Sequence, residues 1–506
     1  MRKTIPFLIL IGFAGCLVQS ALSQTVTVHP NPSQTLTQRW DWAQKTSRSN
    51  PYQKGFWIGY SIEKLMSKNS WTGSFNSRWK DKPSLSQLIY GKKAADEDEK
   101  LTDGEIVRRA AREALDDLEG RDTEEEQVVK ELAILFHFTR GKQFDDVKLS
   151  NLSLHVDLDE IPLIWLGKAD PVESVGHLTS LYSQAKSGES KEDVVTAVGI
   201  HPKSGQVMNF LAGKLNSKES DEIRENAAFW LGQQDDPEAL KILVKTANGD
   251  RSGDVREKAV FAISQLDLDE TASALITLAR QAKDTNVREQ AVFWLGQTEG
   301  EEALDALLNM AETDPSEDVR EKAVFAISQM KGKAATKALI RLAKQGQKSH
   351  VREQAVFWLG QRNAPEGLKL LLQIANQDPS AEVREKAVFA VSQMESEQAT
   401  DALIDMAYHA KNKETRKKAV FWLGQKATKL SASVLEDVAY KDDDVEIQKQ
   451  AVFALSQLPG DEGIPRLIEI GKTHSSLKVR KQAIFWLGQT DDSRAVDALV
   501  EMVRKK

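Results

Sequence analysis

The chain has 506 residues, of which 41% are apolar and 28% charged, with a formal net charge of −7. This length suggests about three globular domains, unless the chain is an array of repeats. The mildly acidic balance argues against a nucleic-acid partner, because that role needs a basic face over most of the length.

Residues 1–23 have the pattern of a secretory signal peptide. Arg2 and Lys3 precede the apolar run TIPFLILIGFAGCLV, and small residues follow it. We therefore expect an exported protein of the periplasm or cell envelope. The single cysteine, Cys16, lies inside this segment, so the sequence excludes a disulfide within the chain. Simple cleavage after residue 23 would release the mature protein. FAGC also resembles a bacterial lipobox, in which case Cys16 would be lipidated and the lipid anchor would be the only attachment to a membrane. An uncleaved signal is the third possibility.

Residues 24–95 form a region rich in aromatic residues, which we interpret as a small cap over the first repeat. The β-prone run Gly55–Ile62 predicts a strand, and a terminal repeat must cover its apolar end. A glycan- or peptide-binding patch built from the tryptophans is the alternative. Five of the eleven tryptophans lie here: Trp40, Trp42, Trp57, Trp71 and Trp79.

Residues 96–156 read as a helical joint region. A charged segment is followed by two stretches, 105–120 and 124–142, whose patterns predict helices. The alternating stretch 147–158 predicts a strand.

From residue 157 to 506 the chain repeats one phrase at intervals of 32 residues. VREQAVFWLGQ at 287–297 returns unchanged at 351–361, and between them VREKAVFAISQ at 319–329 replaces Trp-Leu-Gly with Ala-Ile-Ser. Apolar residues recur at helical spacing in both halves of each unit, so each unit is predicted to be a helical hairpin. Two weaker copies, at Trp165 and Ala197, bring the predicted total to about eleven hairpins in an all-α solenoid.

The segment DTNVREQAVFWLG resembles the second helix of HEAT repeats, and the short unit is similar to the bacterial HEAT-like type named for phycobilin lyases. The resemblance covers about two thirds of the chain. It implies a right-handed α-solenoid that serves as a platform for other macromolecules. Enzymes of this group resembling deoxyhypusine hydroxylase bind iron through His-Glu pairs, and this sequence has no His-Glu dipeptide. We therefore expect no catalytic residues, no cofactor and no metal.

On a helical wheel, Val287, Ala291, Trp294 and Leu295 share the face that packs on the first helix. The phenylalanine of the phrase points outward instead. Either each ring leans over the seam between repeats, or the rings form an apolar track for a partner segment. These phenylalanines are Phe229, Phe261, Phe293, Phe325, Phe357, Phe389, Phe421, Phe453 and Phe485.

The outward charged position of the phrase changes sign along the array. Six glutamates give way to three lysines, which predicts an acidic stretch and a basic C-terminal end that would orient a complementary partner. Solvated surface charges without a binding role are the alternative. The position is occupied by Glu225, Glu257, Glu289, Glu321, Glu353, Glu385, Lys417, Lys449 and Lys481.

These patterns together predict a monomeric, exported, non-catalytic scaffold that binds another protein or a peptide in the concave groove of the solenoid. The alternative from a different class is an enzyme or a small-ligand or glycan-binding protein that uses the tryptophan-rich N-terminal region.

Overall fold

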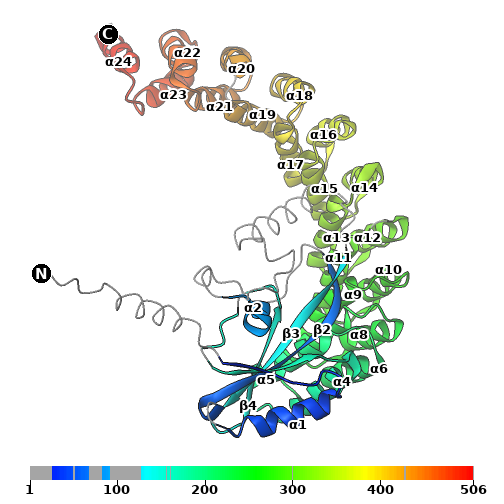
Figure 1. Ribbon diagram of the computed structural model, residues 1–506. Coiled ribbons are helices and arrows are strands. Elements are labelled where there is room, and N and C mark those ends of the chain that lie inside the picture. The colour runs from blue at the N-terminus through cyan, green and yellow to red at the C-terminus, as the bar shows by residue number, and fades with distance from the viewer. Residues whose placement is uncertain are drawn as a thin grey trace, which may run out of the picture. The chain divides into compact units, whose positions relative to one another are not determined.

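The computed structural model (Figure 1) describes residues 25–49, 52–67, 83–91, 127–154, 156–159, 161–298, 300–426 and 429–504. The predicted signal peptide with Cys16, and the helix predicted over 105–120, lie outside these residues. The chain divides into two compact units, unit 1 with residues Met1–Leu268 and unit 2 with residues Asp269–Lys506.

Unit 1 begins with a mixed β-sheet whose described strands have the order β1-β5-β2-β3-β4. β2 pairs antiparallel with β3 and parallel with β5. Both faces of β2 are covered, so its first eight residues are all buried instead of alternating between core and solvent. The elements are β1 (Val26–Val28), α1 (Leu36–Thr46), β2 (Gly55–Ser67), α2 (Leu85–Tyr90), β3 (Gln127–Thr139), β4 (Phe144–Asn151) and β5 (Leu163–Lys168).

The sheet confirms two of the strands predicted from the sequence and corrects two other assignments. β2 contains the strand predicted at 55–62, and β4 overlaps the one predicted at 147–158. The helix predicted over 124–142 is wrong for its described part, because VVKELAILFHF forms β3 between β2 and β4. Trp165 does not belong to a repeat, since it lies fully buried in β5.

The helical array begins at α4, and the residues that the structure describes contain ten complete hairpins followed by α24 (Ser493–Arg504). The first helices are α4 (Pro171–Tyr182), α6 (Gly205–Leu215), α8 (Pro237–Gly249), α10 (Thr271–Gln281), α12 (Glu301–Thr313), α14 (Gly332–Gln345), α16 (Pro365–Gln377), α18 (Glu397–His409), α20 (Lys429–Lys441) and α22 (Gly460–Thr473). The second helices are α5 (Gly188–Gly199), α7 (Asp221–Leu231), α9 (Gly253–Ser264), α11 (Thr285–Leu295), α13 (Glu317–Gln329), α15 (Ser349–Gln361), α17 (Ala381–Gln393), α19 (Lys413–Lys426), α21 (Val445–Ser456) and α23 (Leu477–Leu487).

The fold is therefore the all-α solenoid predicted from the repeats, with a small sheet region at its N-terminal end. In unit 2 the second helices form one layer, on the inner side of the curve that this unit follows, and the first helices form the outer layer (Figure 1). We call these the second-helix layer and the first-helix layer. Within each hairpin the core consists of small and aliphatic residues such as Val351, Ala355 and Leu359, all buried.

The two versions of the repeated phrase create two kinds of contact between neighbouring hairpins. Where a Trp-Leu-Gly helix is followed by an Ala-Ile-Ser helix, the backbones approach closely. A Cβ atom placed on Gly360 would lie only 2.7 Å from the Cα of Ala390. Gly296 and Gly424 meet Ala326 and Ala454 in the same way. Glycine at this position is required by helix packing, since a methyl group would have no room.

An ion pair strengthens the same close contact. Arg352 donates from Nε and Nη2 to the two carboxylate oxygens of Asp378, at 2.8 and 3.0 Å. Asp378 ends the first helix of the following hairpin. Arg288 with Asp314 repeats this bidentate geometry, and Arg416 bonds Asp442 at 3.2 Å. The ion pairs thus tie the hairpins together in alternate contacts.

The other kind of contact is aromatic. Where an Ala-Ile-Ser helix is followed by a Trp-Leu-Gly helix, the tryptophan of the later helix reaches back to the earlier phenylalanine. The ring centroids of Phe325 and Trp358 are 5.2 Å apart, and those of Phe389 and Trp422 are 5.0 Å apart. The 64-residue double unit therefore alternates a small-residue contact with a large aromatic one.

Candidate functional site

In unit 2 the aromatic side chains of the second-helix layer form a connected row. Trp358 contacts both Phe325 and Phe357, and Phe357 stacks on Phe389 with ring centroids 6.1 Å apart. The pattern repeats through the following helices as far as Phe485, which contacts Trp486. We call this the aromatic row; it consists of Phe325, Phe357, Trp358, Phe389, Phe421, Trp422, Phe453, Phe485 and Trp486.

The aromatic row is only partly covered by the fold. Eight of its rings are half-buried, and Phe485 is 54% exposed. The rings do lean over neighbouring hairpins, as the seam interpretation predicts, and they also leave apolar surface accessible, as the track interpretation requires. The structure brings these predicted phenylalanines together and leaves both roles open to them.

The other three predicted phenylalanines are placed separately. Phe293 lies in unit 2, with its ring 5.0 Å from that of Trp294. Phe229 and Phe261 lie in unit 1 and stack with ring centroids 6.2 Å apart. All three are half-buried.

The prediction that the tryptophan of the phrase faces the hairpin core is wrong. Trp358 and Trp422 are half-buried and belong to the aromatic row, while the alanines that replace tryptophan in alternate repeats, such as Ala390, are buried. The wheel places tryptophan near the edge of the core face. A wheel for one helix does not reveal that the preceding hairpin lies against that edge and takes up the large ring.

The outward charges make contacts between neighbouring second helices. Glu353 pairs with Lys386 at 3.2 Å, and Glu385 pairs with Lys418 at 2.7 Å. Each of these pairs joins one hairpin to the next, so both glutamates have a structural contact. Glu289 and Glu321 are half-buried positions of the same layer.

The lysines at the outward position have local partners or lie at the surface. Lys417 is 4.0 Å from Glu414 and Lys449 is 3.1 Å from Glu446, each one turn earlier in its own helix. Lys481 is exposed on α23. Pairs of this kind at the surface contribute little to stability, which leaves the lysines able to exchange partners.

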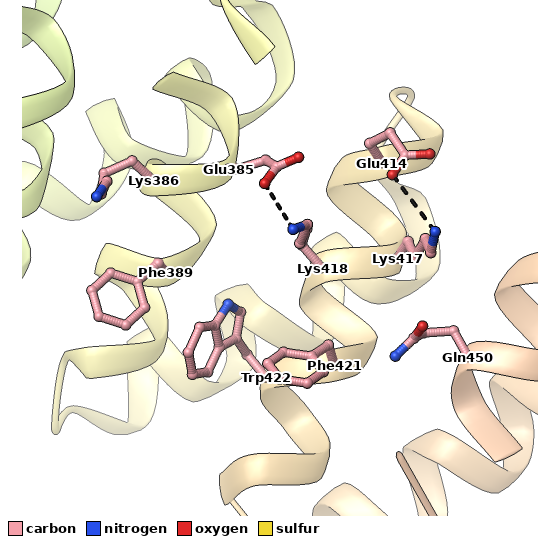
Figure 2. Close-up of a pocket in the computed structure, with 9 residues that line it drawn as sticks. All are labelled: Glu385, Lys386, Phe389, Glu414, Lys417, Lys418, Phe421, Trp422 and Gln450. Carbon is pink, nitrogen blue, oxygen red and sulfur yellow. Dashed lines mark ion pairs between the residues drawn. The ribbon is translucent and has the colours of Figure 1, made fainter. Parts of the chain in front are cut away.

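A pocket of about 480 Å³ opens on the aromatic row between α17, α19 and α21. Figure 2 shows Phe389, Phe421 and Trp422 lining it, with the charged side chains nearer the N-terminal ends of α17 and α19. The dashed lines mark the pairs of Lys418 with Glu385 and of Lys417 with Glu414. The other two residues that line the pocket are Lys386 and Gln450. Such a lining of rings with charged groups around it suits an apolar side chain from a partner.

Sequence reasoning missed five residues of this pocket: Lys386, Glu414, Lys418, Trp422 and Gln450. Their signal was available, because three of them occupy the position directly after the outward charge, and Trp422 neighbours Phe421. The wheel assigned that next position to a flank between repeats. It did not show that the flanks of three neighbouring second helices, α17, α19 and α21, together enclose one pocket.

The glutamines that end the phrase do not bridge neighbouring repeats in the alternate helices where their side-chain bonds are defined. Gln329 and Gln393 donate to the hydroxyl of the serine directly before them, and that hydroxyl donates to the phenylalanine carbonyl one turn earlier. These bonds stay within one helix. They stabilise the C-terminal end of one helix and do not connect neighbouring hairpins.

The tryptophans of the N-terminal region are divided between the core and the surface. Trp40 and Trp57 are buried against the sheet, where Trp40 packs on Phe136 and on His177. Trp42 is half-buried. Trp71 and Trp79 lie outside the described residues. A ligand patch built from all five tryptophans is therefore excluded, since two of them fill the core.

The histidines near the start of the array have structural surroundings. His201 is buried, with Nδ1 2.7 Å from the carbonyl oxygen of Ala197 and Nε2 2.8 Å from the hydroxyl of Ser174, and burial lowers its pKa to about 4. Burial also lowers the pKa of His177 to about 4. Across the described ranges, groups of three or more histidine, cysteine, aspartate or glutamate side chains that could hold a metal ion are absent. Among the same residues, helices long and apolar enough to span a membrane are also absent.

Comparison with protein families identifies the array. The family model of HEAT repeats matches residues 208–288, 272–356 and 345–424. The model of the PBS lyase HEAT-like repeat matches residues 479–505. No curated protein matches the chain.

Solved structures of helical arrays are similar to this chain at low identity. YibA of E. coli is 20% identical over 54% of this chain and 99% of its own, with a TM-score of 0.30. Human deoxyhypusine hydroxylase is 16% identical over 58% of this chain and 96% of its own, with a TM-score of 0.23. Yeast importin-β (Kap95p) is 12% identical over 65% of this chain and 53% of its own, with a TM-score of 0.33.

Proposed function

The chain is a HEAT-repeat protein, and on that premise we propose that it is a non-catalytic scaffold that binds a segment of another protein along the aromatic row. The observation that carries this proposal is the continuity of the row. Rings from Phe325 to Phe485 touch one another in sequence, and each remains partly accessible. Monomeric proteins rarely expose a contiguous apolar surface of this kind unless it binds something.

An extended or helical protein segment fits this surface better than a small ligand does. The accessible rings follow the direction of the array over several hairpins, and the pocket between α17, α19 and α21 is one hollow on this longer surface. Neighbouring second helices are about 10 Å apart. A ligand that covers several rings must therefore be a chain, with a side chain for each hollow.

We further propose that the protein is exported as a monomer to the periplasm or cell envelope. Residues 1–23 support this by their charged start and apolar run. A lipid on Cys16 is an additional proposal that rests on FAGC. Mass measurement of the mature protein separates cleavage after residue 23 from lipidation at Cys16. A mature chain that retains Met1 and lacks lipid overturns both.

The proposed binding surface can be tested by substituting two central rings. The variant Phe325→Ser/Phe357→Ser should lose capture of a protein partner from envelope extract while its helicity stays unchanged and its melting temperature falls by no more than a few degrees. Val496→Ser/Val500→Ser is the matched control, because it removes two exposed apolar side chains from α24 and should leave capture intact. Unfolding of the phenylalanine variant would show that the rings serve the fold, and the proposal would fail.

A further inference from the structure

The charges beside the aromatic row become more positive toward its C-terminal end. The pocket between α17, α19 and α21 has a rim of three lysines and two glutamates. One double unit earlier, the five equivalent positions hold one lysine, Lys322, and two glutamates, Glu321 and Glu353, together with His350 and Gln354. One double unit later they hold Lys449, Lys478 and Lys481 and no carboxylate.

The rings beside these charges have the same arrangement in each double unit. Phe389 with Trp422 and Phe421 is followed, 64 residues later, by Phe453 with Trp486 and Phe485. Phe485 is the most exposed ring of the row. The kinds of ring and their arrangement therefore stay the same in each double unit while the charge beside them rises.

The ion pairs within the layer follow the same gradient. Glu353 and Glu385 each engage a lysine of the next helix, and through these pairs the earlier part of the layer neutralises its own charges. At the outward position, lysine replaces glutamate from residue 417 on. The later helices therefore carry a cation at the position where the earlier helices carry a glutamate. Glu414 and Glu446 remain as surface partners of Lys417 and Lys449.

From this gradient we propose that the segment bound on the aromatic row is acidic, with aromatic or large apolar anchors separated by carboxylates, and that its acidic part lies on α19, α21 and α23. The proposal rests on the proposed function and assigns the chemistry of the partner. The rings take the anchors, and Lys417, Lys449 and Lys481 take the carboxylates. A carboxylate can replace a surface glutamate as the partner of a lysine without leaving a buried charge unpaired.

The geometry sets the length of such a segment. Four successive second helices spaced by about 10 Å span roughly 30 Å, and an extended chain covers about 3.3 Å per residue, so about nine residues connect the first and last anchors. A probe peptide of about twelve residues with phenylalanine at every third position and glutamate between them meets this requirement.

The test measures binding of three labelled peptides to the full mature chain by fluorescence anisotropy. The peptides share their phenylalanines and carry glutamate, lysine or serine between them. The glutamate peptide should bind at least about tenfold more tightly than the other two at low salt, with the preference lost at high ionic strength.

Two variants with the same change of net charge locate the effect. Lys417→Glu/Lys449→Glu/Lys481→Glu should abolish the preference for the glutamate peptide and its salt dependence. Lys337→Glu/Lys344→Glu/Lys369→Glu reverses three exposed lysines of the first-helix layer and should leave both unchanged. Circular dichroism of both variants confirms that the helices remain.

The outcomes separate this inference from the proposed function. Equal binding of all three peptides would refute the proposal that the bound segment is acidic, and so would a glutamate preference that survives in Lys417→Glu/Lys449→Glu/Lys481→Glu. Either result would still be compatible with the aromatic row as a binding surface. Tighter binding of the lysine peptide overturns the acidic segment in the same way. Failure of every peptide to bind overturns the inference, and if Phe325→Ser/Phe357→Ser also captures partners as wild type does, the proposed function fails separately.

Discussion

Replacing Gly360 with alanine tests the packing that explains the two versions of the phrase. The added Cβ atom would lie 2.7 Å from the Cα of Ala390 and 2.8 Å from its Cβ and carbonyl oxygen. Carbon atoms in contact are normally about 3.5–4.0 Å apart, so α15 and α17 must separate by roughly 1 Å. The atoms met are mostly backbone, and a change of rotamer cannot make room for the methyl group.

The expected cost follows from two opposing effects. Overpacking of this kind destabilises by about 1–3 kcal/mol, and alanine in place of glycine within a helix recovers up to about 1 kcal/mol. We therefore expect Gly360→Ala to lower the free energy of unfolding by about 1–2 kcal/mol. Amide hydrogen exchange should show the loss in α15 and α17, which matters because repeat arrays need not unfold in one step.

Gly367→Ala provides the matched control. Gly367 lies on α16, and a Cβ atom added there would be 3.5 Å from a methyl group of Leu359, which is an ordinary contact distance. This variant should be neutral or stabilised by up to about 1 kcal/mol. If Gly360→Ala is as stable as Gly367→Ala, the close contact between alternate helices does not exist and the explanation of the 64-residue unit is wrong.

Three further substitutions test the account elsewhere. Asp378→Ala removes the partner of Arg352, whose side chain is only 12% exposed, and should cost about 2–4 kcal/mol in urea unfolding, whereas Asp378→Asn should cost less. Trp358→Ala should cost about 1–2 kcal/mol, below the 3–5 kcal/mol expected for a core tryptophan, because the ring is half-buried. Burial and the neighbouring Asp146 raise the pKa of Asp193 to about 7, so this aspartate should destabilise the fold progressively as the pH rises from about 4 to 7. Asp193→Asn should flatten that dependence in melting temperatures measured from pH 5 to 8; an unchanged slope would exclude Asp193 as its source.

The sign of the Asp193 effect follows from proton binding. Its pKa is higher in the folded chain than in the unfolded chain, so the folded state binds more protons in this range and loses stability as the pH rises. Solvent near the carboxylates screens the pair, so we expect a slope contribution of about 1–2 kcal/mol across the range.

The repeat register made much of the fold predictable. The 32-residue interval and the apolar spacing located the second helices, and residues whose side chains can cap a helix precede several of them. The side chains of Asp284, Ser380, Asn412 and Asp444 accept hydrogen bonds from backbone N–H groups in the first turn. Ser252 and Ser316 occupy N-cap positions without such a side-chain bond, and there Asp250 and Asp314 accept from the serine N–H instead.

The remaining errors come from contacts distant in sequence. VVKELAILFHF has residues acceptable to helix and strand, and β3 forms because β2, more than 60 residues earlier, pairs along its length. The letters WLG at Trp165 predict a repeat, although the neighbours of this residue place it in the sheet. The pocket was missed because it requires three helices at once. A pattern within one helix carries no information on which neighbour meets each flank.

The most direct test of the account is site-specific photo-cross-linking on the aromatic row in the cell. A photoreactive phenylalanine analogue in place of Phe421 should form a discrete covalent adduct with another protein. The same analogue in place of Lys369, exposed on the first-helix layer, should form none. An adduct at both positions, or at Lys369 alone, would contradict binding through the aromatic row, and so would the absence of an adduct at Phe421 in a folded protein.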